Sequence, residues 1–532
     1  MKKCCFLAVL AIALLAFVPA AIAQSATCTA VTPANSAFNA ALLGSGFSGT
    51  AGSPNGFANV NFSLNGNLAT VNAGALGLSS ITGISLFMGQ PGTTNAQLVQ
   101  TFSTSANPFS NGQFTGTATL SPFMVSEIQA NPSSFFFVVT TPDFPNGALA
   151  GSLTPTRQQL ITGVLVAPLI NNAGSFILSI GPNNGSGNVT LNFDIASGSL
   201  ANNTINSLQL LPAAGGSPII TFANNITAVG GRITGSTQIS NTLAQQLLAN
   251  PCAFSLGVSS SSFGGGAAKG TLAASNEVFL AVVGSAQGVN GTNFKTDVNV
   301  FNNSPFGLST SSANAFVQFY PQGGLNSTTA ITAQSVTSLN VAPRGTTTLR
   351  DISSSLFNGS ISGIGALRIV SANSVFANAR IYNDQTASGM GTFGQFEPGM
   401  LRSQALQQGV LVGVGVVGTN PLLANGQSFR TNIGFFNPND TPTTVALELR
   451  DTNGAIMATQ MVTLGPWTQT QLPLTNAGGL FNGITADLAT SSVFFLSGNP
   501  IFAYASQIDN VSGDASFITP SADFDSGGPT GQ

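Results

Sequence analysis

Hydrophobic and polar residues alternate along many short segments of this chain. In the clearest run, single polar residues separate the apolar residues Val189, Leu191, Phe193 and Ile195. A period of two is typical of a β-strand that buries one face and leaves the other face polar. The pattern therefore predicts β structure through much of the chain.

Turn signals join these segments into hairpins. The stretch TVALELRDTNGAIMATQMVTL, from Thr444, alternates on both sides of Asn453-Gly454. Asn-Gly is the strongest short hairpin signal because both residues tolerate positive φ. The pair recurs at Asn55, Asn65, Asn111, Asn146, Asn184, Asn290, Asn358, Asn425 and Asn482. Strands punctuated this often, in units of about 110 residues, predict an all-β fold of tandem antiparallel β-sandwich (immunoglobulin-like) modules.

The first half of the chain repeats itself. Residues 114–153 align without a gap on residues 233–272, and both copies keep the pair Asn131-Pro132 or Asn250-Pro251. A short helix is expected in each copy, capped by Ser121 in the first and by Ser240 in the second. This similarity predicts two copies of one module in tandem.

A second, different pair of repeats follows. The segment NGTNFKTDVNVFNN from Asn290 is echoed by NGQSFRTNIGFFNP from Asn425, and LFNG occurs at Leu356 and again at Leu480. The expected order is a signal peptide (1–23), an N-terminal segment (24–37), two copies of the first module (38–155 and 165–273), one copy of the second (276–385), a linker (386–407), its second copy (408–519) and a polar tail (520–532).

The N-terminal residues have the pattern of a secretory signal peptide. Lys2 and Lys3 precede an almost wholly apolar stretch at 4–20, and Ala21-Ile22-Ala23 fits a cleavage site after Ala23. The alternative is an uncleaved membrane anchor, against which the short apolar stretch argues. No later stretch has the uninterrupted apolar length of a membrane span. We therefore expect a secreted or cell-surface protein.

Two of the four cysteines leave with the signal peptide. The mature chain keeps Cys28 and Cys252, in a compartment where thiols can be oxidised. One disulfide between Cys28 and Cys252 and two free thiols are both compatible with the sequence.

Composition narrows the functional classes. Charged residues make up 5% of the chain, and the mature chain keeps 11 of the 13 basic residues against 16 acidic ones, so nucleic acid is a poor partner. Because the chain has no His, a Ser-His-Asp or Cys-His arrangement cannot be built. A glycosidase with paired carboxylates stays formally open, although the four Glu residues (Glu127, Glu277, Glu397, Glu448) are scattered and Trp467 is the only Trp. We expect no cofactor, no metal and no catalysis.

Three motifs have both a functional and a structural interpretation. The segment GVGVVG at 413–418 matches a dinucleotide-binding pattern, but Pro421 follows soon after it, and we expect an ordinary strand. Lys295-Thr296-Asp297 and Arg430-Thr431-Asn432 could bind a ligand, or the basic residue could pair with a nearby carboxylate. The residues Asp509, Asn510 and Asp514 could hold calcium, or they could form a turn.

The most distinctive loop is the turn of a hairpin within FFVVTTPDFPNGALAGSL, from Phe136. Asn146-Gly147 sets the turn, while Asp143 and Phe144 could present a contact surface to a partner. Alternatively, Phe144 packs under its own hairpin, since the second copy keeps Phe263 in its place but has no equivalent of Asp143.

This hairpin resembles the CHRD (chordin-type) domain found in many secreted bacterial proteins. The matching residues are Phe136, Val139, Thr141, Pro145, Asn146, Gly147, Leu149, Gly151 and Leu153. Thr140 stands where the family has His and Ala150 where it has Arg; the second copy has Ser259 and Lys269 at those positions. The resemblance covers residues 38–155 and, more weakly, 165–273. It implies a β-sandwich that takes part in extracellular protein interaction.

These patterns favour a non-catalytic protein of a bacterium that acts in extracellular protein interaction, adhesion, or envelope or matrix structure. Its expected partner is another protein or a surface polymer, and the sequence does not set its oligomeric state. The alternatives are a secreted carbohydrate-binding or carbohydrate-hydrolysing protein and a calcium-dependent module.

Overall fold

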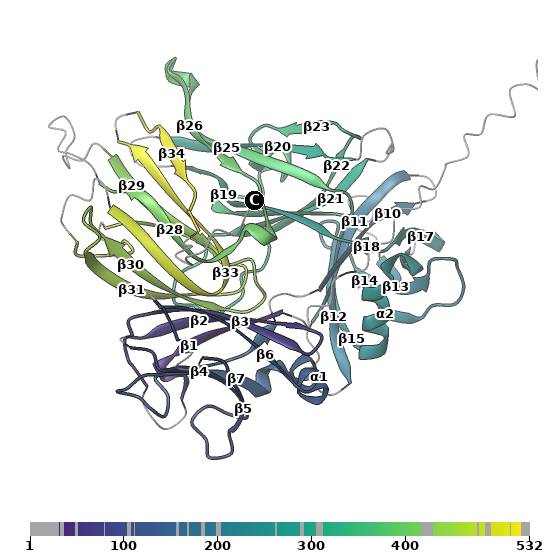
Figure 1. Ribbon diagram of the computed structural model, residues 1–532. Coiled ribbons are helices and arrows are strands. Elements are labelled where there is room, and N and C mark those ends of the chain that lie inside the picture. The colour runs from purple at the N-terminus through teal and green to yellow at the C-terminus, as the bar shows by residue number, and fades with distance from the viewer. Residues whose placement is uncertain are drawn as a thin grey trace, which may run out of the picture.

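The computed structural model of the chain is all-β, which confirms the predicted fold class (Figure 1). Four sheets follow one another along the sequence, and the ladders between their strands are antiparallel. The structure describes residues 31–522 apart from 32–36, 48–51, 79, 104–107, 111, 156–158, 168–169, 182–186, 198–203, 261–262, 288–291, 305–311, 417–428, 476–477, 485–490 and 511. The expected signal peptide at 1–23 lies outside the described residues. Among the residues that the structure describes, no helix has the length and apolar character needed to cross a lipid bilayer.

The first module is one continuous sheet path folded onto itself. Its strands are β1 (Ala37–Leu43), β2 (Phe57–Asn65), β3 (Leu68–Leu76), β4 (Gly83–Met88), β5 (Gln97–Thr101), β6 (Gln113–Thr119), β7 (Phe135–Thr140), β8 (Leu149–Ser152) and β9 (Thr154–Pro155). They pair in the order β5-β4-β7-β8-β1-β2-β3-β6, with β9 beside β1. The rings of Phe62 on β2 and Phe137 on β7 lie 5.6 Å apart although these strands are not neighbours in the sheet. The two halves of the path therefore face each other as a sandwich.

The second module repeats this topology strand for strand. It contains β10 (Gln159–Ala167), β11 (Ile170–Ile180), β12 (Asn188–Ala196), β13 (Thr204–Pro212), β14 (Ile220–Thr227), β15 (Arg232–Ser240), β16 (Phe254–Ser260), β17 (Phe263–Thr271) and β18 (Ala273–Ala274). The order is β14-β13-β16-β17-β10-β11-β12-β15, with β18 beside β10. The run at 189–195 is strand β12, and its apolar residues are buried as predicted.

Short helices occupy equivalent places in these two modules. The hydroxyl of Ser121 accepts a hydrogen bond from Met124 N, and that of Ser240 accepts one from Leu243 N, which confirms both predicted caps. The α-helices are α1 (Pro122–Ala130), α2 (Asn241–Ala249) and α3 (Ile352–Ser355). The 3-10 turns are η2 (Gly44–Gly46), η3 (Pro132–Ser134), η5 (Pro251–Ala253), η7 (Thr386–Ser388) and η8 (Arg402–Gln404).

The third and fourth modules share a second topology. The third has β19 (Asn276–Gln287), β20 (Asn293–Asn302), β21 (Ala313–Pro321), β22 (Ser335–Val341), β23 (Thr346–Leu349), β24 (Gly363–Ser371), β25 (Val375–Gln385), β26 (Gly391–Pro398) and β27 (Met400–Leu401). The fourth has β28 (Leu406–Val414), β29 (Phe429–Phe436), β30 (Thr443–Arg450), β31 (Ile456–Leu464), β32 (Gln469–Pro473), β33 (Ser491–Asp509) and β34 (Ala515–Ile518). One long strand, β33, pairs with β28, β29, β30 and β34, and so replaces both β24 and β25.

Two expected boundaries differ from the structure. Residues 386–407, expected as a linker, contain β26 and β27, which pair with β25 and β19 of the third sheet. The inward side chains of β26 include Gln395 and Glu397, so the apolar alternation that marks a strand is missing there. In addition, β10 begins at Gln159, before the expected start of the second module at 165.

The four modules pack together rather than forming a string. In Figure 1 the first module lies beneath the strands of the fourth, although these two are farthest apart in the sequence. Phe57 of β2 is buried in one cluster with Ala446 of β30 and Leu496 of β33. Nearby, Asn59 Nδ2 donates to the carbonyl of Ser497 at 3.1 Å. The third module likewise packs on the fourth, through a cluster that includes Phe279, Phe436 and Tyr504.

Candidate functional site at the module junction

A cavity of about 360 Å³ lies where the second, third and fourth modules meet. The second module contributes a wall from β11, β12 and β15, the third contributes side chains of β21 and β24, and the fourth contributes loop residues. The polar side of the β12 alternation faces this space: Asn192 and Asp194 line the cavity, whereas Leu191 and Ile195 are in the core of the second module. The strand pattern that builds the sandwich thus also supplies the wall of the site.

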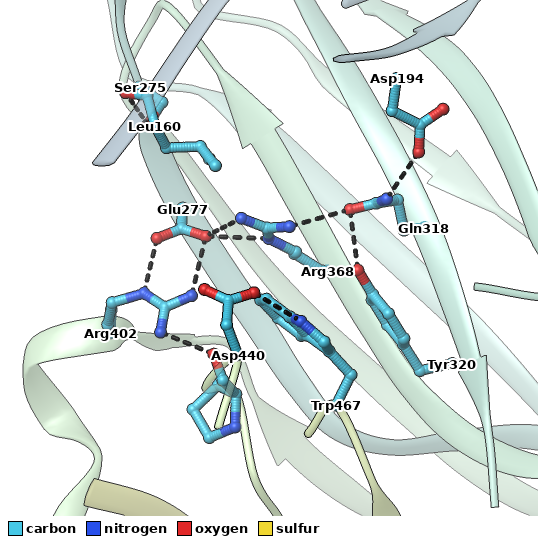
Figure 2. Close-up of polar contacts among 11 residues, drawn as sticks. Leu160, Asp194, Ser275, Glu277, Gln318, Tyr320, Arg368, Arg402, Asp440 and Trp467 are labelled. Atoms are coloured by element: carbon cyan, nitrogen blue, oxygen red, sulfur yellow. Dashed lines mark hydrogen bonds and ion pairs between the residues drawn. The ribbon is translucent and has the colours of Figure 1, made fainter. Parts of the chain in front are cut away.

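The polar centre beside the cavity is Glu277, held between two arginines (Figure 2). Glu277 Oε1 accepts hydrogen bonds from Arg368 Nη2 at 2.6 Å and from Arg402 Nη2 at 3.0 Å. Glu277 Oε2 accepts from Arg402 Nε at 2.6 Å. Burial alone raises the pKa of Glu277, but the two guanidinium charges outweigh it and hold this pKa below its usual range. The carboxylate therefore stays ionised at neutral pH.

Strand register explains this placement. In the β19–β24 ladder Phe279 lies opposite Arg368, so Glu277 and Arg368 are diagonal neighbours on one face. In the β21–β24 ladder Gln318 lies opposite Arg368, and Arg368 Nη1 donates to Gln318 Oε1 at 3.1 Å. Arg402 comes from η8, after β27, and its Nη1 donates to the carbonyl of Pro438 in the fourth module at 2.7 Å.

Tyr320 extends the network and stays protonated. Its hydroxyl donates to Gln318 Oε1 at 3.1 Å, from the same face of β21. Burial raises the pKa of Tyr320 to about 12. The Tyr320 ring stacks on Trp467 with the ring centroids 5.0 Å apart.

Trp467 joins the fourth module to this network. Its Nε1 donates to Asp440 Oδ1 at 2.9 Å, and the Arg368 guanidinium lies 4.5 Å from the Trp467 ring centroid. Trp467 has a φ of +57°, a region that bulky residues rarely adopt. Such a backbone conformation persists where surrounding contacts over-determine it, as the indole contacts do here.

The opposite wall is an ion pair in the second module. Arg232 Nη2 donates to Asp194 Oδ2 at 2.7 Å and Arg232 Nε donates to Asp194 Oδ1 at 2.9 Å, a two-point pairing. Arg232 Nη1 also donates to the carbonyl of Ala333 in the third module at 3.1 Å. Gln318 Nε2 donates to Asp194 Oδ2 at 3.2 Å, so the second and third modules are joined by hydrogen bonds across the cavity.

The acidic side chains in and beside the cavity already have partners. Asp194 faces Arg232, Glu277 faces Arg368 and Arg402, and Asp440 accepts from Trp467. Such contacts suit the fixing of modules and the binding of a polar ligand. In the part of the chain that the structure describes, no three Cys, Asp or Glu side chains are grouped so that they could hold a metal ion.

The loop expected to present a contact surface lies between β7 and β8, away from this cavity. Phe144 packs against the core of the first module, as the structural alternative expects. Asp143 and Asn146 are exposed. Gly147 has a φ of +137°, and its N donates to the carbonyl of Phe144 at 3.1 Å. The turn is therefore built around Phe144, with two polar side chains facing outward.

The repeated basic motifs have structural contacts. Lys295 Nζ pairs with Asp384 Oδ2 at 2.9 Å, as the local-pairing alternative expects, and Arg430 donates to Asn510 Oδ1. Thr296 and Thr431 play one equivalent role, because their hydroxyls donate to backbone carbonyls of Gly284 at 2.8 Å and of Gly415 at 2.6 Å.

The other two motifs are also explained locally. Asp509 forms a turn, in which its carbonyl accepts from Gly513 N at 2.9 Å and its N donates to the carbonyl of Asp514 at 2.8 Å. Gly413 lies in strand β28, while the following residues from 417 lie outside the described part of the chain.

Cys252 is in a disulfide. Cys28, the partner that the sequence allows, lies outside the described residues. Val31 N, three residues after Cys28, donates to the carbonyl of Leu248 at 2.8 Å at the end of α2. The beginning of the described chain thus lies beside the helix that precedes Cys252.

Sequence patterns did not identify the junction site. The sequence shows Glu277 only as one of four scattered Glu residues and Trp467 only as the single Trp, and no motif includes Arg232, Arg368, Arg402 or Asp440. One signal was present: Arg368 interrupts the otherwise uncharged strand GIGALRIVS. A charge in such a strand needs a buried partner, although the sequence does not say which carboxylate supplies it.

Comparisons with known proteins give no name to this site. No family model matches the chain, and no curated protein matches it. Among solved structures, the crystal structure of Thermotoga maritima 1070 is 11% identical over 22% of this chain and 96% of that chain, with a TM-score of 0.18. That likeness supports no assignment.

Proposed function

We propose that the chain is a secreted or cell-surface, non-catalytic bacterial protein that acts as a rigid scaffold in extracellular protein interaction, adhesion, or envelope or matrix structure. The observation that carries this proposal is that two charged side chains at the junction contact more than one module. Arg232 and Arg402 each bind a carboxylate and also donate to a backbone carbonyl of the next module, Ala333 or Pro438. Because each of these side chains contacts two modules, the contacts fix the modules relative to one another.

The CHRD resemblance of the first two modules supports the same class of function. In this proposal both modules are CHRD-like sandwiches, and the exposed Asp143 and Asn146 belong to the surface that meets an extracellular protein or polymer. Thr140 and Ala150 stand at the positions of the family's His and Arg, so contacts that those two side chains make in the family are not part of this proposal.

The disulfide at Cys252 supports an extracellular location, because stable disulfides form in oxidising compartments. We propose Cys28 as the partner, since the described chain begins beside α2 at Val31. Peptide mapping of the secreted protein without reductant tests both points. A peptide pair joining Cys28 to Cys252 and a new N-terminus at Gln24 are expected; a free Cys28 thiol or an uncleaved leader contradicts them.

The scaffold proposal is tested by fractionation of native cultures into medium, salt wash, detergent extract and cell interior. Chemical cross-linking and affinity capture from the richest fraction then identify neighbours, with a cytoplasmic marker protein as the control for lysis. Recovery with the envelope or matrix, together with a reproducible partner, is the expected result. Partnerless protein in the medium overturns it and favours the binding of a soluble ligand, while release of sugars from a polysaccharide substrate overturns it and favours carbohydrate hydrolysis.

A further inference from the structure

The junction cavity has balanced charge. Three basic side chains line it, Arg232, Arg368 and Arg402, and they are balanced by Asp194 and Asp440 in the lining and by Glu277 beside it. A charged ligand entering this space would lose hydration without meeting an uncompensated opposite charge. A neutral polar ligand avoids that cost and can still accept or donate hydrogen bonds. The balanced charge of the cavity therefore favours a neutral ligand over a charged one.

One wall offers unused hydrogen-bonding groups. The side chains of Ser179, Asn192 and Thr234 line the cavity and make no hydrogen bond with another part of the described chain. They lie on the neighbouring strands β11, β12 and β15, where Ser179 pairs with Asn192 and Thr234 pairs with Asp194. Hydroxyl and amide groups can both donate and accept. This wall therefore matches a ligand that carries several hydroxyl groups along one edge.

Apolar side chains complete the cavity. Leu160 and Ile177 also line it, and C–H groups of a ligand can pack against them. Trp467 adds to the lining, although its ring already contacts Tyr320 and Arg368. A volume of about 360 Å³ is near the lower end of the usual range for ligand pockets, about 300 to 1,000 Å³. Thr234 and Thr332 are exposed, so the space opens to solvent beside them. The cavity thus has room for one small ring with its substituents directed outward.

We propose that the junction cavity binds one neutral sugar residue, free or at the end of a glycan, with Asn192 and Thr234 as hydrogen-bonding residues. This inference goes beyond the scaffold function, because it gives the module junction a ligand of its own. Binding there bridges the second, third and fourth modules, so the ligand also stabilises their packing.

The test uses isothermal titration calorimetry on the full mature chain. The probes are glucose, galactose, mannose and N-acetylglucosamine, their neutral oligosaccharides, and glucuronate and glucosamine as charged analogues. Saturable binding of at least one neutral sugar, at least tenfold tighter than its charged analogue, is expected. Equal affinity for a monosaccharide and its oligosaccharide indicates a free sugar ligand, and tighter binding of the oligosaccharide indicates a glycan end. No saturable binding up to about 10 mM, or tighter binding of a charged analogue, overturns the proposal.

Two variants locate the binding site. Asn192→Ala removes a side chain that holds nothing else in place, so it should fold normally and weaken binding about fivefold to tenfold. Thr190→Ala is the matched control, since Thr190 lies on the same face of β12 but does not line the cavity, and it should bind as the parent does. Unchanged affinity in Asn192→Ala, with its melting temperature also unchanged, overturns the assignment of the site.

Discussion

Two buried glutamates of the third module show opposite solutions to the cost of burying a carboxylate. Glu277 is neutralised by Arg368 and Arg402. Glu397 is fully buried, its Oε1 accepts from Val282 N at 2.9 Å, and its Oε2 has no hydrogen-bond partner in the described chain. Burial raises the pKa of Glu397 well above its usual range, and the backbone hydrogen bond only partly offsets this effect. One carboxylate thus holds its charge and the other resists ionisation.

Glu277→Gln should destabilise the protein strongly. The amide keeps the shape of the side chain but leaves two buried guanidinium groups without their counter-charge, which costs about 3 to 5 kcal/mol. Denaturant unfolding measures this loss. The matched control is Asp143→Asn, which removes a carboxylate at an exposed loop position and should change stability by less than about 0.5 kcal/mol. Similar values for the two variants would contradict the role given to Glu277.

Glu397→Gln should change the pH dependence of stability. Because the folded-state pKa of Glu397 is raised, the parent loses stability as the pH rises above the unfolded value of about 4.3. The variant cannot ionise there, so its stability relative to the parent should improve between about pH 4 and neutral pH.

For Glu277→Gln the sign is reversed: the benefit of the ionised Glu277 is complete above about pH 4.3 and is lost as the pH falls toward its lowered folded-state pKa. Urea unfolding of the parent and the two variants, measured from acidic to neutral pH, gives the free energy of unfolding of each protein as a function of pH. If the three proteins show the same pH dependence, the pKa shifts of both Glu277 and Glu397 are contradicted.

The charges at the junction show why the site could not be predicted residue by residue. Glu277, Arg368 and Arg402 are separated by long stretches of sequence, and none belongs to a motif. They meet because β19 pairs with β24 and because the chain returns through η8. Local patterns predict which face of a strand is buried, but they do not predict which module covers its other face.

At the scale of single elements, the strand and turn patterns were informative. The alternation at 189–195 and the caps Ser121 and Ser240 are confirmed, as is the hairpin at Asn453-Gly454, which joins β30 and β31. In that turn only Gly454 has a positive φ. The sequence pattern does not predict strand β26, because this strand buries Gln395 and Glu397, two residue types that are usually exposed.

The turn at Gly147 is held by a long-range contact. A Cβ added at Gly147 would lie 2.3 Å from Cζ of Phe47, and the φ of +137° already disfavours any other residue. Gly147→Ala should therefore cost more than about 1 kcal/mol in thermal or denaturant unfolding. Gly66→Ala is the control, because Gly66 also has a positive φ, +57°, but has nothing within 4 Å of the added Cβ. An equal cost for both variants would show that Phe47 does not constrain the turn.

At the scale of the whole molecule, packing links modules that are distant in sequence. The first module meets the fourth through Phe57, Ala446 and Leu496, and Asn39 Nδ2 donates to Asn499 Oδ1 at 3.2 Å in the same interface. The second module meets the third through Leu160, Ile177 and Phe316. The repeats predict the modules but not this arrangement, because each copy of a repeat meets a different neighbour.

Leu496→Glu should separate the first module from the fourth. Leu496 is 3% exposed, so a carboxylate there would be buried without a partner or would open the interface to water. Small-angle scattering should give a larger radius of gyration, and hydrogen exchange should rise along β1–β3, while circular dichroism keeps its β signature. Val412→Glu, at a position that is 60% exposed, is the control and should change neither measurement. An unchanged radius in Leu496→Glu would mean that other contacts suffice to dock the modules.

The docking of the first module on the fourth also sets the order in which the molecule can be completed. Ribosomes synthesise the first module earliest and the fourth module, on which it docks, last. The apolar patch around Phe57 is therefore exposed while more than half of the chain is synthesised. During that interval the fourth module of another chain offers the same complementary surface. Contacts between the first and fourth modules of one chain therefore compete with the same contacts between two chains. A high local concentration of chains favours the contacts between chains, and so favours domain-swapped dimers.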